Sequence, residues 1–492
     1  MNIRLFAGSV LALSVIPAGV TAQSLAGSDP HPEVHTYAAE DFDIDPNGVT
    51  YTKDIAPILR RSCEGCHNPN GGAPMSLTTF QEVRPWARSI RLRTSIRDRM
   101  GAMPPFFVEK DLGILEFKDD PSLSDEELAK IQAWVDNGAP QGDLSDMPPP
   151  REVADAGGWA LGEPDLVLRS REMTVPAIGP DRWGDIGLVP TGLTEDRYVK
   201  SVEVREINDM SVGAASATVG GRWVFHHMTY SSGVLNEAGT GIIDDTRQSW
   251  PIHEVGRNAD IFPEKFGTLL QANSALHLRA SHIHPNGIQE TKAHLEFGLI
   301  LHPKGYVPEY GNRARLRLGN GTDIDVVPGR AGQEFHAFTV LEQHTKIVAF
   351  EPHLHAPGTR MCIEAIWGTN HFTLNCVGYD HNWVKQYVYK DDAAPLLPKG
   401  TIMHVIGFLD TTAGNENVAD NRNWAGGGRR SVANMFIDLG YSVELTEEQF
   451  QSEMAERRAR MKSRNDYDVG CPLCWAPALT DDIETTQEGA QQ

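Results

Sequence analysis

Apolar and polar residues alternate with two different periods along the chain, and the change of period divides it into a helical part and a β-rich part. Apolar residues recur at helical spacing over 55–59 and again over 128–135. The second run follows Ser124-Asp-Glu-Glu127, a capping-box pattern, and Gly138 closes it. These features predict short helices in the N-terminal part of the chain.

Between about 165 and 445 the pattern is typical of strands. Short runs of β-branched and aromatic residues alternate with turns rich in Gly, Asn and Pro, and that length accommodates two antiparallel sandwiches. Upstream, Pro148-Pro-Pro150 and Gly157-Gly158 predict a linker. Downstream, the charge-rich segment 446–464 predicts a helix that either packs on the neighbouring sandwich or serves for docking.

The predicted fold is therefore multidomain, with a small all-α domain followed by two antiparallel β-sandwich domains of a jelly-roll-like type. A chain of 492 residues is too long for a single hydrophobic core. The expected parts are a signal peptide at 1–22, an N-terminal extension at 23–45, the helical domain at 46–145, a linker at 146–164, sandwiches at 165–308 and 309–445, and a C-terminal helix and tail at 446–492.

Charge and the N-terminal residues bear on location and partners. The chain has 44 Lys and Arg against 66 Asp and Glu, a formal net charge of −22 spread along its length, which argues against nucleic acid as a partner. Arg4, the apolar stretch Leu5–Val20 and the small residues before Gln23 predict a cleaved signal peptide. No other run approaches the length of a membrane span, so we expect a periplasmic or secreted mature chain without a transmembrane segment.

The six cysteines fall into three pairs, and export permits disulfides in any pair that has no other use. Cys362 and Cys376 lie symmetrically about a predicted hairpin turn at 368–370, which predicts a disulfide across two strands. Cys471 and Cys474 are interpreted as a local disulfide, with a redox pair and half of a metal site as the alternatives.

Cys63-Glu-Gly-Cys-His67 matches the attachment pattern of a c-type haem, in which Cys63 and Cys66 bind the haem covalently and His67 binds the iron. The alternative is a disulfide beside an incidental histidine. Met103 is the expected sixth ligand because neighbouring prolines hold its segment extended, and Met75 and Met100 compete with it. Residues 46–145 also resemble the c-type cytochrome domain fused to copper monooxygenases and other exported bacterial oxidoreductases, and this resemblance supports Met103.

Spacing selects three clusters among the eighteen histidines. His353 and His355 follow an apolar run, and residues two apart on a strand share a face, so both imidazoles can bind one metal. The adjacent pair His226-His227 points to opposite faces of a regular strand, and joint binding therefore requires a bulge or a strand end. The third cluster is His282-Ile-His284. Isolated histidines are interpreted as ordinary hydrogen-bonded residues: His253, His277, His294, His302 and His404.

Histidines alone leave zinc, copper and iron open. Residues 200–445 resemble the catalytic core of the copper type II, ascorbate-dependent monooxygenases, the group of the peptidylglycine α-hydroxylating and dopamine β-monooxygenases. The similar segments are Val224–Met228, Ser281–Gly287, Glu351–Ala356 and Val432–Phe436. The resemblance implies an electron-storing copper at His226, His227 and His282, and an oxygen-activating copper at His353, His355 and Met435. Two departures from the family pattern are His284 beside His282 and the glycine-rich segment Trp424–Arg430 before Met435.

The expected function is that of an exported oxidoreductase with one covalent haem c and two copper ions, which hydroxylates a small-molecule or peptide substrate with dioxygen. In this hypothesis the haem passes electrons to copper from a periplasmic donor, either a cytochrome or an ascorbate-like reductant. The alternative is a non-catalytic multidomain c-type cytochrome that acts in electron transfer or binding.

Overall fold

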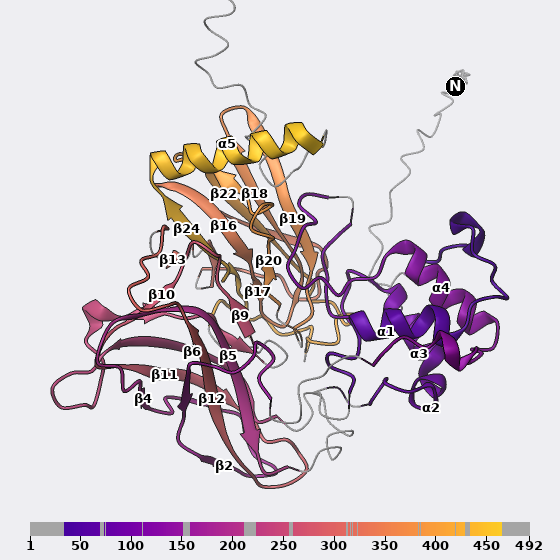
Figure 1. Ribbon diagram of the computed structural model, residues 1–492, viewed down its shortest axis with the longest axis horizontal. Coiled ribbons are helices and arrows are strands. Elements are labelled where there is room, and N and C mark those ends of the chain that lie inside the picture. The colour runs from indigo at the N-terminus through magenta and orange to yellow at the C-terminus, as the bar shows by residue number, and fades with distance from the viewer. Residues whose placement is uncertain are drawn as a thin grey trace, which may run out of the picture.

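The computed structural model describes residues 34–464 except 69–72, 74, 111, 151–157, 211–222, 255–258, 311–312, 315, 317, 322, 382, 384, 419 and 429–432. The expected signal peptide and the pair Cys471 and Cys474 lie outside the described residues. Helices occupy the first part of the described chain, antiparallel strands follow with the one-turn helix η6 (Asp244–Thr246) among them, and one helix ends it (Figure 1).

The helical elements between residues 34 and 150 pack around one small core, in which Leu59, Ile131 and Trp134 are buried. Ser124 and Glu127 exchange hydrogen bonds at the start of the last long helix, so the predicted capping box is confirmed. The elements are η1 (Ala39–Phe42), η2 (Tyr51–Ile55), α1 (Ala56–Ser62), α2 (Phe80–Val83), η3 (Arg84–Trp86), α3 (Ala87–Ser95), α4 (Asp125–Asp136) and η4 (Leu144–Asp146).

Two antiparallel sheets form the first β unit. Their strands are β1 (Leu166–Arg169), β2 (Met173–Val175), β3 (Arg182–Gly184), β4 (Leu188–Pro190), β5 (Arg197–Asn208), β6 (Phe225–Val234), β7 (Gln248–Ser249), β8 (His253–Glu254), β9 (Ala259–Ile261), β10 (Thr268–Leu270), β11 (Ser274–Ile283) and β12 (Thr291–Leu301). One sheet has the order β1-β12-β5-β10, and the other has the order β3-β11-β6-β7. Both contribute to one core, for example through Phe297 and Tyr230.

Three smaller antiparallel sheets form the second β unit. Their strands are β13 (Arg313–Ala314), β14 (Gly319–Asn320), β15 (Gln333–Val340), β16 (His344–Phe350), β17 (Pro352–Leu354), β18 (Gly358–Trp367), β19 (Asn370–Gly378), β20 (Tyr387–Val388), β21 (Leu396–Leu397), β22 (Ile402–Leu409), β23 (Phe436–Asp438) and β24 (Tyr441–Leu445). The sheet orders are β13-β24-β16-β20, β14-β23-β17 and β15-β22-β18-β19.

Strand β16 joins the cores of the two units, because neighbouring residues along it are buried in different cores. Val348 packs into the core of the first unit, whereas Ile347 and Phe350 pack into the core of the second. The last helix, α5 (Glu447–Arg464), covers this sheet and buries Phe450 and Met454 in the first unit's core. Of the two alternatives predicted from the sequence, packing on the neighbouring sandwich or docking, the structure shows a packed helix.

Part of the expected helical domain lies against the second β unit instead of among the helices. In the segment 98–121, the N–H groups of Glu109, Ile114 and Lys118 donate to carbonyl oxygens of β19 and β20 over 2.8 to 3.0 Å. Glu109 also forms a two-point ion pair with Arg360 of β18. The segment 98–121 thus connects the haem-motif region to the strands.

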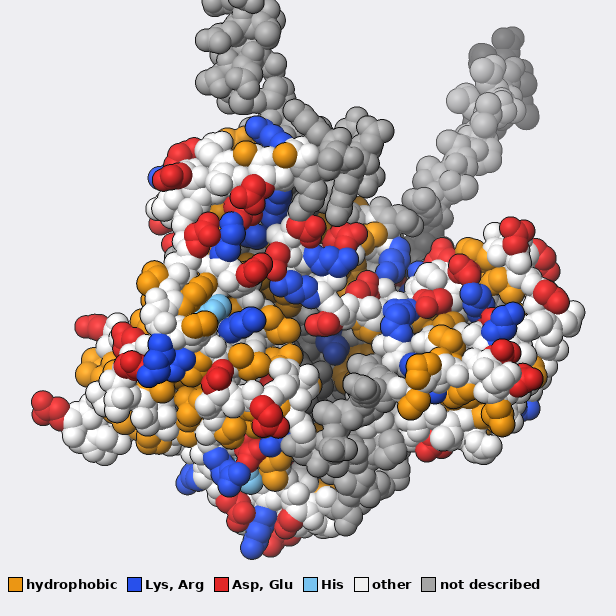
Figure 2. All heavy atoms as spheres, viewed as in Figure 1, with side chains coloured by type: hydrophobic (Ala, Val, Ile, Leu, Met, Phe, Trp, Pro, Cys, Tyr) orange, Lys and Arg blue, Asp and Glu red, His pale blue; other side chains and the backbone are white. Residues whose placement is uncertain are grey.

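Several expectations from the sequence are confirmed by these elements. The β-rich region consists of antiparallel sheets, and Cys362 and Cys376 form a disulfide as direct partners in β18 and β19. Within the part of the chain that the structure describes, no helix combines the length and apolarity needed to cross a membrane. Acidic and basic side chains are interspersed over the face shown in Figure 2, in keeping with charges spread along the sequence.

Candidate metal centres

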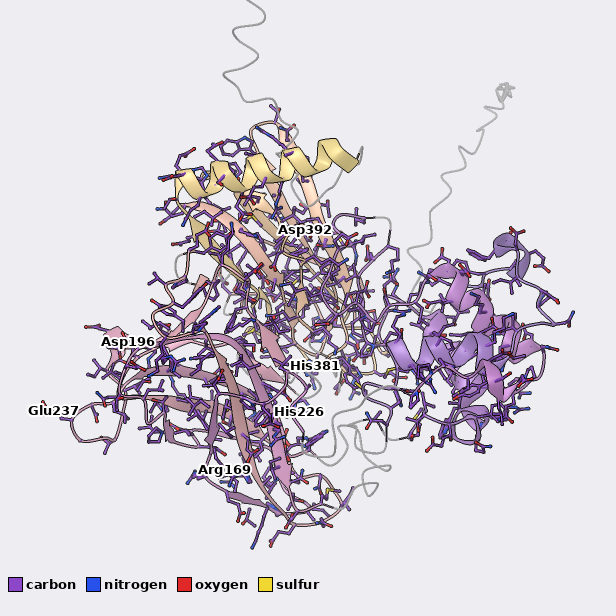
Figure 3. All side chains as sticks on the ribbon, viewed as in Figure 1. Arg169, Asp196, His226, Glu237, His381 and Asp392 are labelled. Carbon is purple, nitrogen blue, oxygen red and sulfur yellow. A yellow bond between two sulfur atoms is a disulfide. The ribbon has the colours of Figure 1, made fainter. Side chains whose placement is uncertain are left out.

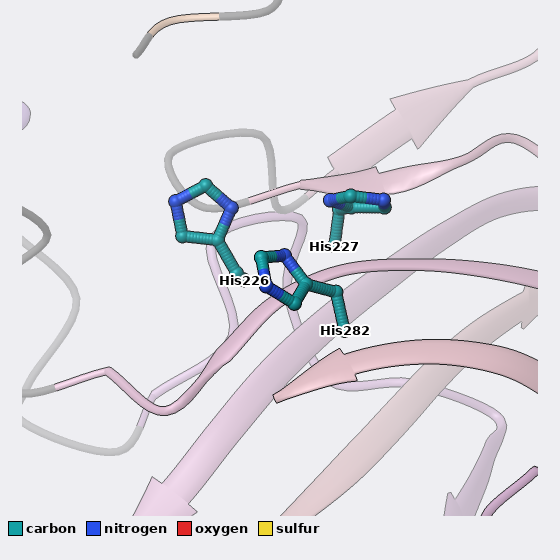
Figure 4. A group of neighbouring side chains, drawn as sticks. All are labelled: His226, His227 and His282. Atoms are coloured by element: carbon teal, nitrogen blue, oxygen red, sulfur yellow. The ribbon is translucent and has the colours of Figure 1, made fainter. Parts of the chain in front are cut away.

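Three histidines gather on one side of strands β6 and β11 (Figure 4). His227 and His282 are direct cross-strand partners, but the next pair is Ile283 with Phe225, so the register passes over His226. This bulge lets two adjacent histidines serve one site, as their joint binding of a metal requires. One ring nitrogen from each of His226, His227 and His282 lies within 4.8 Å of the others, so the three could hold one metal ion.

The carboxylate of Asp181 orients the ring of His282. Nε2 of His282 lies 2.9 Å from Oδ2 of Asp181, and its Nδ1 is buried without a hydrogen-bond partner among the described residues. Trp183 stacks on the same ring, with centroids 4.4 Å apart. A proton on Nε2 leaves the lone pair of Nδ1 for a metal. His284 lies beside His226 but outside the group of three, so the geometry favours His282 over His284.

Glu206 of β5 holds the beginning of β6. Its buried carboxylate accepts hydrogen bonds from the N–H groups of Val224 at 3.0 Å and Phe225 at 2.8 Å. These two residues directly precede His226 and His227, so Glu206 fixes the backbone from which the histidine pair enters β6. Sequence reasoning missed this residue because it lies far from the pair in the chain.

The second group lies at the end of β17, where the rings of His353 and His355 are 5.3 Å apart between centroids. Nδ1 of His355 lies 3.0 Å from the carbonyl oxygen of Ala433, and its backbone N–H donates to the carbonyl of Met435 at 3.3 Å. The side chain of Met435 lies over Gly321, where an added Cβ would come within 2.7 Å of its Cε. The fold therefore brings Met435 beside His355 from a distant part of the chain.

Desolvation favours the neutral form of His226, His227 and His353. Desolvation, and after it the neighbouring imidazoles, lowers the pKa of His226 to about 4, of His227 to about 2 and of His353 to about 3. A neutral imidazole offers the lone pair that a metal needs. His353 is one of the neighbours that lower the pKa of His227, so the two groups lie within electrostatic reach of each other.

A further histidine, His381, lies within electrostatic reach of both groups. It contributes to the lowered pKa of His226 and of His353, and Figure 3 labels it near His226, where the two β units meet. Burial lowers its own pKa, and its Nδ1 is buried without a hydrogen-bond partner among the described residues. Sequence reasoning missed His381 because it belongs to no paired motif.

The residues of the haem motif directly follow α1, and both thiols are unpaired. The N–H of His67 donates to the carbonyl of Cys63 at 2.9 Å, and burial raises the pKa of the Cys63 thiol to about 12. Nδ1 of His67 lies 3.0 Å from the carbonyl of Met75, which leaves Nε2 for iron. Unpaired thiols at Cys63 and Cys66 with one oriented imidazole fit a covalent haem.

The three methionines proposed for the sixth haem position have different surroundings. Met75 packs against the helical core, and the sulfur of Met100 already accepts a hydrogen bond from Asn417 at 3.1 Å. Met103 lies in the segment that docks on the second β unit, and its N–H donates to the carbonyl of Arg93. Its role as the axial ligand stays a prediction.

Comparisons with known proteins do not place this chain in a family. No protein-family model matches it, and no curated protein matches it significantly. Among solved structures, a turret protein of Sulfolobus turreted icosahedral virus is 9% identical, with 57% of this chain and 100% of that chain covered and a TM-score of 0.13. The N-terminal CBM22-1-CBM22-2 tandem domain of Paenibacillus barcinonensis Xyn10C is 10% identical, with 59% and 100% covered and a TM-score of 0.13. Likenesses this weak carry no argument about the chain.

Proposed function

We propose that this protein is an exported oxidoreductase related to the copper type II monooxygenases, with one covalent haem c and two copper ions, and that it hydroxylates a small-molecule or peptide substrate with dioxygen. The observation that carries the proposal is the pair of histidine groups, one in each β unit. Both contain half-buried or buried imidazoles, desolvation lowers the pKa of His226, His227 and His353, and the groups are close enough for His353 to affect the pKa of His227.

His226, His227 and His282 would hold one copper ion, and His353, His355 and Met435 would hold the other. When bound, copper supplies dioxygen activation and electron storage, and haem supplies one-electron transfer. Three imidazoles suit copper in either oxidation state, whereas the thioether of Met435 favours the reduced ion. The low pKa of His226, His227 and His353 keeps protons from competing for the metal at neutral pH.

Cys63, Cys66 and His67 would hold the haem, with Met103 as the expected sixth ligand. A contact between this region and the β units supports an internal path for electrons. The N–H of Gly101 donates to the carboxylate of Asp380 at 3.0 Å, and the next residue, His381, lies within electrostatic reach of both histidine groups. The proposed external donor is a periplasmic cytochrome or an ascorbate-like reductant.

The copper-to-iron ratio tests this proposal. Full-length protein would be produced with c-type haem maturation, reconstituted with copper and freed of loosely bound metal. We expect a ratio of about two in the wild type and about one in His353→Ala/His355→Ala, because the variant loses both imidazoles of one site. The control His277→Ala/His294→Ala removes two histidines that lie outside both groups and should keep the wild-type ratio.

Two other results would contradict the proposed function. A protein that retains its haem spectrum but binds no copper specifically contradicts the monooxygenase and favours a multidomain cytochrome in electron transfer or binding. If both double variants lose the same amount of copper, the metal is held non-specifically and the proposed sites are wrong.

A further inference from the structure

Four side chains from four adjacent strands meet on the sheet β15-β22-β18-β19, outside both histidine groups. Glu364 of β18 and His404 of β22 are direct cross-strand partners. Their neighbours Ala365 and Val405 point into the core, so Glu364 and His404 face the opposite side of the sheet. His371 of β19 and His336 of β15 lie beside them.

The polar atoms of this cluster converge closely. Nε2 of His371 and Nδ1 of His404 lie 2.8 and 2.7 Å from one oxygen, Oε2 of Glu364. One ligand atom from each of Glu364, His371 and His404 lies within 4.8 Å of the others. Glu364 and His404 are buried, whereas the side chain of His371 is 55% exposed. The cluster is thus backed by the sheet and reachable from solvent.

Further contacts hold these side chains in place. Nδ1 of His336 lies 3.0 Å from Nε2 of His404, and the hydroxyl of Thr373 donates to Oε1 of Glu364 at 3.2 Å. Phe338 stacks on the ring of His404, with centroids 4.1 Å apart. Without a metal, Nδ1 of His404 carries the proton that faces Glu364. When a metal ion replaces that proton, His404 keeps its proton on Nε2 and donates it to His336, and the lone pair of Nδ1 binds the metal.

We propose that Glu364, His371 and His404 form a zinc site that nothing in the copper chemistry requires. Two imidazoles and one carboxylate are a typical zinc ligand set, and three protein ligands leave a fourth position for water. His336 and Thr373 orient two of the ligands through their outer atoms, as the partners of zinc ligands commonly do. Zinc bound here links β18, β19 and β22, and therefore stabilises this sheet.

Zinc binding by the full-length protein tests the site. Protein stripped of free metal with a chelator would be dialysed against buffered zinc chloride, and zinc per chain would be measured by mass spectrometry. We compare the wild type with His371→Ala and with His344→Ala. His344 is a matched control because, like His371, it lies near the start of a strand of the second unit and close to a glutamate, Glu447, at 2.7 Å. Among the described residues it belongs to no group of three possible metal ligands.

We expect His371→Ala to hold one zinc ion fewer per chain than the wild type or His344→Ala, with affinity at this site reduced at least about tenfold. Zinc should raise the melting temperature of the wild type and of His344→Ala by more than that of His371→Ala. Zinc at other histidines affects all three proteins equally, so the difference does not depend on the copper sites.

Two further variants separate a metal site from a plain hydrogen-bonded network. Glu364→Gln keeps the size of the side chain but removes its charge, and should lose the same zinc ion. His336→Ala should weaken binding without abolishing it, because His336 only orients His404. If wild type, His371→Ala and Glu364→Gln all bind equal zinc, the cluster is a hydrogen-bonded network and the proposal is overturned.

Discussion

A single hydrogen bond to each imidazole decides which ring nitrogen is available to a metal. His67 and His355 have Nδ1 against a backbone carbonyl, and His282 has Nε2 against Asp181. A proton on the bonded nitrogen leaves a lone pair on the other. We therefore expect His67 and His355 to bind metal through Nε2 and His282 through Nδ1.

The role of Asp181 in orienting His282 can be tested by substitution. In Asp181→Asn the acceptor of the His282 proton is neutral and weaker, so copper affinity at the first histidine group should fall about tenfold. Competition with a chelator of known affinity measures the change. Asp185→Asn is the matched control. Asp185 lies 2.6 Å from His277, which is on strand β11 like His282 but does not belong to the first histidine group.

The two aspartate variants should differ. Equal copper affinity in Asp181→Asn and in the wild type would mean that the carboxylate does not orient a ligand. An equal loss in both variants would show that surface charge, and not the contact with His282, attracts the ion.

Among the elements, the sheet of β1, β12 and β5 holds a buried carboxylate between two arginines. Glu296 of β12 accepts hydrogen bonds from Arg205 of β5 at 2.8 Å and from Arg169 of β1. Burial raises the pKa of Glu296, but the hydrogen bonds from both arginines outweigh burial and bring it below the usual 4.5. The charged form of Glu296 therefore stabilises the sheet.

Glu296→Gln should reduce the free energy of unfolding at neutral pH by roughly 2 kcal/mol, because two charge-assisted hydrogen bonds weaken. The folded pKa lies below the unfolded one, so this stabilisation is present above about pH 4.5 and is lost as the pH falls through the folded pKa. Denaturant unfolding of variant and wild type at pH 7 and about pH 3.5 should show the difference shrinking. The exposed Glu290 provides the control Glu290→Gln, which should match the wild type at both pH values.

At the scale of the whole molecule, the segment 98–121 lies in close contact with the second β unit. At Gly378 of β19 an added Cβ would lie 1.7 Å from the backbone oxygen of Asp98, so any other residue forces the two backbones apart. The N–H of Gly378 also donates to the carbonyl of Phe107 at 2.9 Å. Gly378 thus permits the contact that joins the haem-motif region to the strands.

Gly378→Ala should undock this segment without unfolding the helical core. Hydrogen exchange measured by mass spectrometry should show amides of 107–118 exchanging at least about tenfold faster, since their partners in β19 and β20 move away. Under the proposed function, electron transfer from haem to copper should also slow. Gly179→Ala is the control, because a Cβ there meets only side-chain atoms at 3.6 Å or more. Unchanged protection in Gly378→Ala would contradict this account.

Much of the architecture can be predicted from residues that are neighbours in the chain. The capping box at Ser124 follows from a four-residue motif. The strands between 165 and 445 and the C-terminal helix follow from the spacing of apolar side chains. The Cys362–Cys376 disulfide follows from its symmetry about one turn. Each of these predictions is confirmed because it requires only interactions within an element or across one hairpin.

The local sequence pattern does not predict the full surroundings of the histidine groups. Spacing alone singled out His226-His227 and the pair His353 and His355, but the positions of Asp181, Glu206 and His381 beside them depend on strands far apart in sequence. Strand register determines which of the eighteen histidines meet, and a shift of one residue turns every side chain of a strand to its other face. The residue types and the elements therefore follow from sequence alone. The bulge at His226 and the cluster at Glu364 arise only when whole sheets pack, because packing sets the register between strands.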